Sequence, residues 1–224
     1  MADTIILVPV LCRPKNVERL IESVIRTTRY AKILFLASPG REYFDEHITL
    51  LDASIKYYGI VDYKVMDFPC GKGDYAKKIN YGIRQTTEPF IFLAGDDVVF
   101  HAGWRMACLN SGTLVVGTND LGNPRCINDG HSTHTFVHRE YVNQGLIDGR
   151  TGLLFEDYWH EYVDDELIGT ARKRGVYSFA ENAIVEHLHP SWNKADMDSV
   201  YAAQQERMRL SKNLYLSRKR LWEN

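Results

Sequence analysis

The fold is decided by the stretch TIILVPVLCRPKNVERLIESVIR, residues 4–26, in which a continuous apolar run comes directly before an amphipathic segment. The run over residues 4–10 is rich in β-branched residues, as expected of a strand buried on both faces of a parallel sheet. Pro14 then opens a segment whose apolar residues recur on one helical face. The stretch therefore predicts a strand followed by a crossover helix.

The same alternation continues through the first half of the chain. Further strands are predicted over residues 32–38, 61–66 and 89–95, and further helices over residues 45–58 and 73–87. This order predicts an α/β fold with a doubly wound sheet and right-handed crossovers. Ligands of such sheets bind beyond the carboxyl ends of the strands, so we expect the site after Val10, Ser38, Met66 and Gly95.

The second half, from about Trp104, alternates less regularly. Short strands are predicted over residues 113–117, 134–138 and 176–185, and helices over residues 165–174 and from residue 195 to the end. No linker rich in Pro, Gly or Ser separates the halves, so we expect one domain.

Composition bounds the function without naming it. The net charge of −2 gives no global attraction to nucleic acid or an anionic membrane. The four cysteines are widely spaced and form no CxxC pair, which favours reduced thiols in a cytosolic protein. No apolar run approaches the ~20 residues of a membrane span, and the N-terminus lacks a basic signal region, so we expect a cytoplasmic protein without a membrane span.

Two adjacent carboxylates, Asp96 and Asp97, end the apolar strand in FIFLAGDDVVF, residues 90–100. They lie where ligands are expected, and Mg²⁺ and Mn²⁺ prefer oxygen ligands and accept phosphate oxygens as the remainder. An acidic turn without a metal is the alternative, because Asp is common in turns.

Two other polar pairs are candidates for the same site. His187 and His189 alternate in VEHLHP, residues 185–190, and an imidazole often joins a carboxylate at a metal. Asp164 and Asp165 precede a predicted helix, where a carboxylate could deprotonate an acceptor hydroxyl. Polar strand-end histidines and a simple helix cap are the competing interpretations.

Motifs spread over nearly the whole chain resemble family 2-like glycosyltransferases of the GT-A fold. In order, they are VPVLCRPKNVERLIESV, GKGDYAKKINYGI, FIFLAGDDVVF, VDDELIGTARKRG and VEHLHP. The chain is similar above all to small versions encoded by bacteriophages. The resemblance implies a Rossmann-like mixed sheet with helices on both faces, in one domain over residues 1–224. About residues 1–100 would form the nucleotide-sugar-binding half, and about residues 101–224 the acceptor-side half with a C-terminal helix.

The resemblance also implies a role for each motif residue. The residues expected near the nucleotide are Pro9, Arg13, Ser38, Asp74, Lys78 and Asn80. Those expected at a divalent Mn²⁺ or Mg²⁺ ion are Asp96, supported by Asp97, with His187 as a further ligand and His189 as second choice. Asp164, with Asp165 beside it, is the implied general base, and a UDP-sugar is the implied donor. The metal would neutralise the leaving diphosphate, and the sugar would transfer with inversion.

Three positions depart from the family pattern. The first acid of the usual DxD motif is Ala94, so ligation would rest on Asp96, His187 and the diphosphate. The acid often found after the second strand is Ser38, and the usual Arg before the helix Asn is Ile79. The base selectivity of the donor site is therefore open.

The C-terminal stretch RMRLSKNLYLSRKRLWEN, residues 207–224, carries basic residues with no acid before Glu223. On a helix they would form a surface able to contact phosphates, although a solvated amphipathic helix packed by its leucines explains the pattern as well. Some similar phage enzymes glycosylate hydroxymethylated pyrimidines in DNA, so hydroxymethylated DNA is the first expected acceptor. A virion protein or a glycan precursor is the alternative.

Other readings compete with a glycosyltransferase. A nucleotidyltransferase would carry a glycine-rich loop after its first strand, and VPVLCRPKN has no glycine. A non-catalytic nucleotide-sugar- or glycan-binding module is compatible with Ala94. The histidines of HSTHTFVH, residues 131–138, match neither zinc-finger nor HExxH spacing, so we expect them on the acceptor side or the surface.

Overall fold

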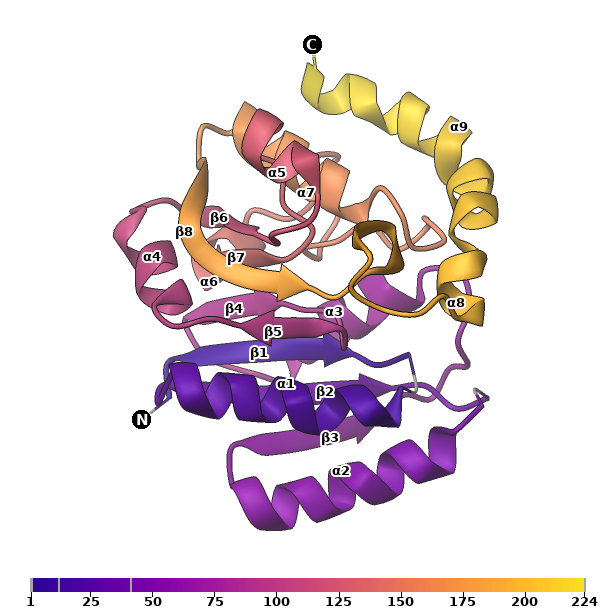
Figure 1. Cartoon of the computed structure of the whole chain (residues 1–224). Helices are drawn as coiled ribbons and strands as arrows, with labels where there is room; N and C mark the ends of the chain where they lie inside the picture. The colour runs from indigo at the N-terminus through magenta and orange to yellow at the C-terminus, as the bar shows by residue number, and fades with distance from the viewer. Residues whose placement is uncertain (1, 12, 41, 224) are drawn as a thin grey trace.

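A mixed sheet with strand order β3-β2-β1-β4-β7-β6-β8-β5 organises the chain (Figure 1). The computed structural model describes residues 2–11, 13–40 and 42–223. The strands are β1 Thr4–Pro9, β2 Ala31–Ala37, β3 Val61–Val65, β4 Phe90–Leu93, β5 Val98–Phe100, β6 Val115–Asn119, β7 Thr135–His138 and β8 Tyr177–His187. The helices are α1 Pro14–Thr27, α2 Phe44–Tyr58, α3 Asp74–Arg84, α4 Trp104–Asn110, α5 Pro124–Asp129, α6 Arg139–Val142, α7 Val163–Lys173, α8 Ser199–Ala202 and α9 Gln204–Glu223, with a 3-10 turn, η1, over Pro190–Trp192.

The first half has the doubly wound order that the sequence predicts. Strand β1 pairs in parallel with β2 on one side and with β4 on the other, and β3 extends the sheet beyond β2. The order of the strands therefore reverses beside β1. Ligands of such sheets bind at this reversal, between the carboxyl ends of β1 and β4.

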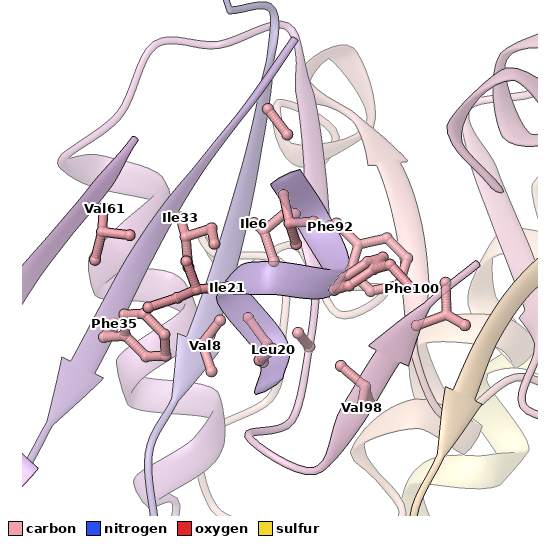
Figure 2. Packing of buried hydrophobic residues seen from close by; sticks show 14 of the residues in the cluster. Ile6, Val8, Leu20, Ile21, Ile33, Phe35, Val61, Phe92, Val98 and Phe100 are labelled. Atoms are coloured by element: carbon pink, nitrogen blue, oxygen red, sulfur yellow. The ribbon is translucent and has the colours of Figure 1, made fainter. Parts of the chain in front are cut away.

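Alternate residues of β1 face two different hydrophobic layers, because successive side chains of a strand point to opposite faces. Ile6 and Val8 pack against Leu20 and Ile21 of α1, in a layer that also includes α2 and α4 (Figure 2). Leu7 belongs to the opposite layer, formed with α3, α6 and α7. Burial on both faces explains why this stretch of sequence is continuously apolar.

The second half adds two strand pairings that matter for the site. Strand β7 runs antiparallel to β4, with Thr135 opposite Leu93. Strand β8 runs parallel to β6 along its first part and antiparallel to β5 at its end, where Val98 lies opposite His187. The predicted strands of this half are confirmed as β6, β7 and β8, whereas β5 and helices α4 to α6 were not predicted.

The C-terminal helix α9 packs along the outside of the molecule against α7 (Figure 1). Its buried Arg218 forms ion pairs with Glu166 of α7 and with Asp148, and its guanidinium lies 3.6 Å from the centre of the Phe155 ring. The predicted helix from residue 195 instead begins at Ser199 and is interrupted at Ala203. Among the described residues, no helix combines the length and the apolar character needed to cross a membrane.

Candidate active site

A cleft of about 280 Å³ opens at the reversal of strand order, between the carboxyl ends of β1 and β4. Its walls also come from the first turns of α3 and α7 and from the segments that follow β8. The predicted site residues that line it are Pro9, Asp74, Asp96, Asp97, Asp164, Asp165, His187 and His189. The position of the cleft confirms the edge of the sheet that the sequence indicated after Val10 and Gly95.

Strand pairing brings one carboxylate and two imidazoles together in this cleft. Asp97, His134 and His187 each offer a ligand atom, and these atoms all lie within 4.8 Å of one another. His187 faces Asp97 through Nε2, and its buried Nδ1 has no hydrogen-bond partner among the described residues. A carboxylate with imidazoles is a donor set that transition metals accept, so the residues fit a divalent ion.

Gly95 permits this close approach. A Cβ atom at residue 95 would lie 2.6 Å from Asp97 Oδ1 and 3.2 Å from His134 Nε2. Any side chain at this position would therefore push the two ligand groups apart.

The two adjacent aspartates have different partners. Asp96 accepts hydrogen bonds from the Leu11 amide at 2.9 Å and from Arg13 at 3.1 Å, whereas Asp97 faces His187, with 3.5 Å between Oδ2 and Nε2. Arg13 also reaches Asp97, at 3.2 Å. The predicted metal ligand Asp96 is thus bound by the loop after β1, and its neighbour Asp97 lies among the imidazoles.

The electrostatics of the aspartate pair follow these partners. Burial raises the pKa of Asp96 to about 6, although the charge of Arg13 opposes the rise. Burial would also raise the pKa of Asp97, but the charge and hydrogen bond of His187 and the charge of Arg13 outweigh it, so this pKa is lowered. Asp97 is therefore held ionised at neutral pH, with its negative charge facing the imidazoles.

The segment after η1 covers the aspartate pair. Asp198 binds the Arg13 guanidinium, with 2.7 Å between Oδ2 and Nε, and this guanidinium lies 4.1 Å from the centre of the Tyr201 ring. The Tyr201 hydroxyl donates to Asp97 Oδ2. Sequence analysis missed both Asp198 and Tyr201, because neither belongs to a recognisable motif.

His189, the second-choice metal ligand, lies beside this segment and outside the ligand group. Its Nδ1 accepts a hydrogen bond from the Ser191 amide and caps η1. Its ring lies 4.6 Å from the Tyr201 ring, edge to face.

The two acids at the start of α7, Asp164 and Asp165, also have different partners. Asp164 Oδ2 lies 3.1 Å from His131 Nε2, and Asp165 forms an ion pair with Arg125. No side chain caps the start of α7, where Tyr162 is the cap residue, so neither acid acts as the N-cap. Burial would raise the pKa of Asp164, but the hydrogen bond and charge of His131 outweigh it and lower this pKa.

Besides Arg13, three residues predicted near the nucleotide have protein partners and do not line the cleft. The fully buried Lys78 binds Asp74 at 3.0 Å and the Val10 carbonyl at 3.2 Å, and Ser38 donates to the same Asp74. Asn80 accepts hydrogen bonds from the amides of the 153–154 segment and donates to the Leu154 carbonyl. These contacts hold the walls of the cleft in place.

With its helices on both faces of a curled, mixed sheet and its cleft at the strand reversal, the chain has the GT-A fold of glycosyltransferases. No family model matches the sequence, and no curated protein matches it significantly.

Three solved structures illustrate the similarity in shape, and each is distant in sequence. A mannosyltransferase from Pyrobaculum calidifontis, in complex with GDP-Man and Mn²⁺, is 12% identical with a TM-score of 0.70; the match covers 96% of this chain and 63% of that one. Glucosyl-3-phosphoglycerate synthase from Mycobacterium tuberculosis, with Mn²⁺, UDP-Glc and phosphoglyceric acid, is 13% identical with a TM-score of 0.65, over 97% of this chain and 80% of that one. S. aureus TarS in complex with UDP is 11% identical with a TM-score of 0.64, over 97% and 72%. What the chain shares with them at these identities is the fold.

Proposed function

We propose that the chain is a metal-dependent glycosyltransferase that moves a sugar from a nucleotide-sugar to an acceptor hydroxyl. The observation that carries the proposal is the Asp97–His134–His187 group, which faces the same cleft as the carboxylate of Asp164. Similar structures hold Mn²⁺ together with GDP-Man or UDP-Glc, which supports a nucleotide-sugar as the donor class. We propose a UDP-sugar in particular.

In this proposal Asp97 and His187 hold the metal, and Asp96, the ligand expected from the motif, keeps Arg13 and the loop after β1 in place. A bound divalent ion would supply positive charge for the leaving diphosphate. Arg13 pairs with both aspartates and with Asp198 and does not line the cleft, so it acts on the donor site by holding the aspartate pair.

The nucleotide half would extend from Pro9 to the first turn of α3. Pro9 and Asp74 line the cleft, so they can contact the donor directly. Lys78 and Ser38 hold the Asp74 carboxylate in position by hydrogen bonds. Asn80 holds the 153–154 segment in the same way. These three residues therefore act on the donor through other residues.

Asp164 is the proposed general base. Its lowered pKa keeps the carboxylate ionised at neutral pH, as a base requires. His131, which is 3% exposed, orients that carboxylate, and Asp165 is occupied by Arg125. Attack on the face of the sugar opposite the diphosphate would give inversion.

The acceptor is the finer part of the proposal. The case for hydroxymethylated DNA rested on the basic residues of α9, and several of these have acidic partners. Arg207 pairs with Glu161, Arg209 with Glu206, Arg218 with Glu166, and Lys219 with Glu223. The pairing favours a packed, internally neutralised helix, so we propose a protein or glycan hydroxyl ahead of DNA.

The test is a panel of nucleotide-sugars, with Mn²⁺, with Mg²⁺ or with chelator. Each reaction receives plain DNA, hydroxymethylated DNA, a protein mixture or glycans, and products are read by mass. Metal-dependent transfer to any acceptor supports the proposal. Binding without hydrolysis or transfer under every condition would instead identify a nucleotide-sugar-binding module.

A further inference from the structure

We propose that His134 is a third protein ligand of the metal, so that the site offers two imidazoles and one carboxylate and prefers Mn²⁺ and Co²⁺ to Mg²⁺. The inference rests on the proposed metal-dependent function. It adds a ligand from the segment HSTHTFVH, residues 131–138, which the sequence alone placed on the acceptor side or the surface.

Two strand pairings place His134 and His187 beside the same turn, which carries Asp96 and Asp97. His134 directly precedes β7, whose first residue lies opposite Leu93 at the end of β4, just before the aspartate pair. His187 ends β8 opposite Val98, just after the pair. The centres of the two imidazole rings lie 4.8 Å apart, with the rings nearly perpendicular. Strand pairing thus places His187, and strand pairing together with the Thr118 and Ser132 hydroxyls on the His134 carbonyl places His134.

A hydrogen-bond chain fixes which nitrogen of His134 faces the metal position. The Thr133 hydroxyl donates to Asp120 Oδ2 at 3.1 Å, so it can only accept from His134 Nδ1, which lies 3.1 Å away. The proton of a neutral His134 is then on Nδ1, and Nε2 keeps its lone pair. Nε2 is the atom on the Asp97 side, as its closeness to the Cβ position of residue 95 shows.

The far end of this chain is itself rigid. Asp120 is 1% exposed, and its Oδ1 accepts hydrogen bonds from the Gly122 and Asn123 amides. Histidines that bind metals are commonly held by such an outer carboxylate, which fixes the tautomer and raises the basicity of the ligand.

The composition of the ligand group sets the preference among cations. Mg²⁺ demands oxygen ligands in near-octahedral geometry and gives up its water reluctantly. Imidazole ligands favour the transition metals, whose affinity rises from Mn²⁺ to Co²⁺. Two imidazoles in a group of three therefore count against Mg²⁺.

The experiment measures Mn²⁺ binding to the purified full chain without any donor, by the electron paramagnetic resonance signal of free Mn²⁺. We expect His134→Ala to weaken binding by more than about 100-fold, and Thr133→Val, which only breaks the chain to Asp120, to weaken it by about 10-fold. The matched control is His138→Asn, which lies at the other end of β7 and outside the ligand group. The Co²⁺ absorption spectrum of the wild type should change in His134→Ala and stay unchanged in the control.

Unaltered Mn²⁺ affinity in a folded His134→Ala would overturn the proposal, as would equal binding of Mg²⁺ and Mn²⁺ by the wild type. If His134→Ala does not fold, Thr133→Val decides, and wild-type Mn²⁺ affinity in this variant overturns the hydrogen-bond chain. Failure of the glycosyltransferase proposal would look different. The wild type would then bind Mn²⁺ through His134 and still transfer no sugar.

Discussion

At the scale of single residues, Asp164 and Asp165 at the start of α7 allow a direct test of the proposed general base. Replacing Asp164 with Asn should lower the rate of transfer by about 10²–10⁴-fold, the usual contribution of a general base, and leave donor affinity unchanged. Asp165→Asn is the matched control, because this neighbour is already neutralised by Arg125. Single-turnover transfer and donor titration measure the two effects. A larger loss in the Asp165 variant would reverse the assignment.

His131 should reveal itself in the pH dependence of transfer. The histidine lowers the pKa of Asp164 against the effect of burial, which favours the ionised form of the base. In His131→Asn the hydrogen bond and charge of the imidazole are lost while burial remains, so the pKa of Asp164 should rise. The acid limb of the kcat/KM profile should therefore move to higher pH, with less activity below neutrality. If the acid limb stays at the same pH while kcat/KM falls equally at every pH, His131 has only a structural role.

At the scale of secondary structure elements, Arg218 should decide how firmly α9 is attached. Its guanidinium is buried between Glu166 and Asp148, and removing one partner of a buried ion pair costs about 3–5 kcal/mol. We expect Arg218→Ala to lower the free energy of unfolding by that amount in urea titrations. Arg209→Ala, in an exposed pair with Glu206 on the same helix, should leave it nearly unchanged. Similar values for both variants would mean that α9 is not held by this ion pair.

The sequence predicted well those elements whose own hydrophobic pattern determines their secondary structure. Strand β1 and helix α1 are recognisable because a fully buried strand is continuously apolar and a half-buried helix has one apolar face. Strand β5 cannot be recognised in this way. Its three residues, Val98–Phe100, are too few to show a hydrophobic pattern, and they form a strand because they pair with β8.

The same distinction explains the site. Asp96, Asp97 and His187 stand in local motifs, so the sequence could nominate them as candidates for the cleft that they line. His134 joins them only through the pairing of β7 with β4, and Asp198 only through its contact with Arg13. No spacing along the chain records either contact, and so neither residue could be predicted from a single sequence.

At the scale of the whole molecule, metal binding should raise thermal stability, since an ion that binds only the folded state shifts the equilibrium by mass action. At 100 times its Kd, Mn²⁺ would add about 2.7 kcal/mol. For a chain of this length that corresponds to a rise in Tm of about 5–10 °C. Differential scanning fluorimetry with Mn²⁺ and with chelator measures it. Asp97→Asn should lose the rise, and a variant that keeps it in full would remove Asp97 from the ligands.

The pairing of strands, and not the length of the loops, fixes the positions of the residues around Asp97. This determines which connections of such a chain can change in length during evolution. Val98 is matched to His187, and Leu93 to Thr135, by backbone hydrogen bonds. The connection over residues 143–151, which contributes no residue to the cleft, can therefore gain or lose residues in descendants without altering the distances around Asp97. The surface beside the cleft could change there while the donor chemistry is inherited intact.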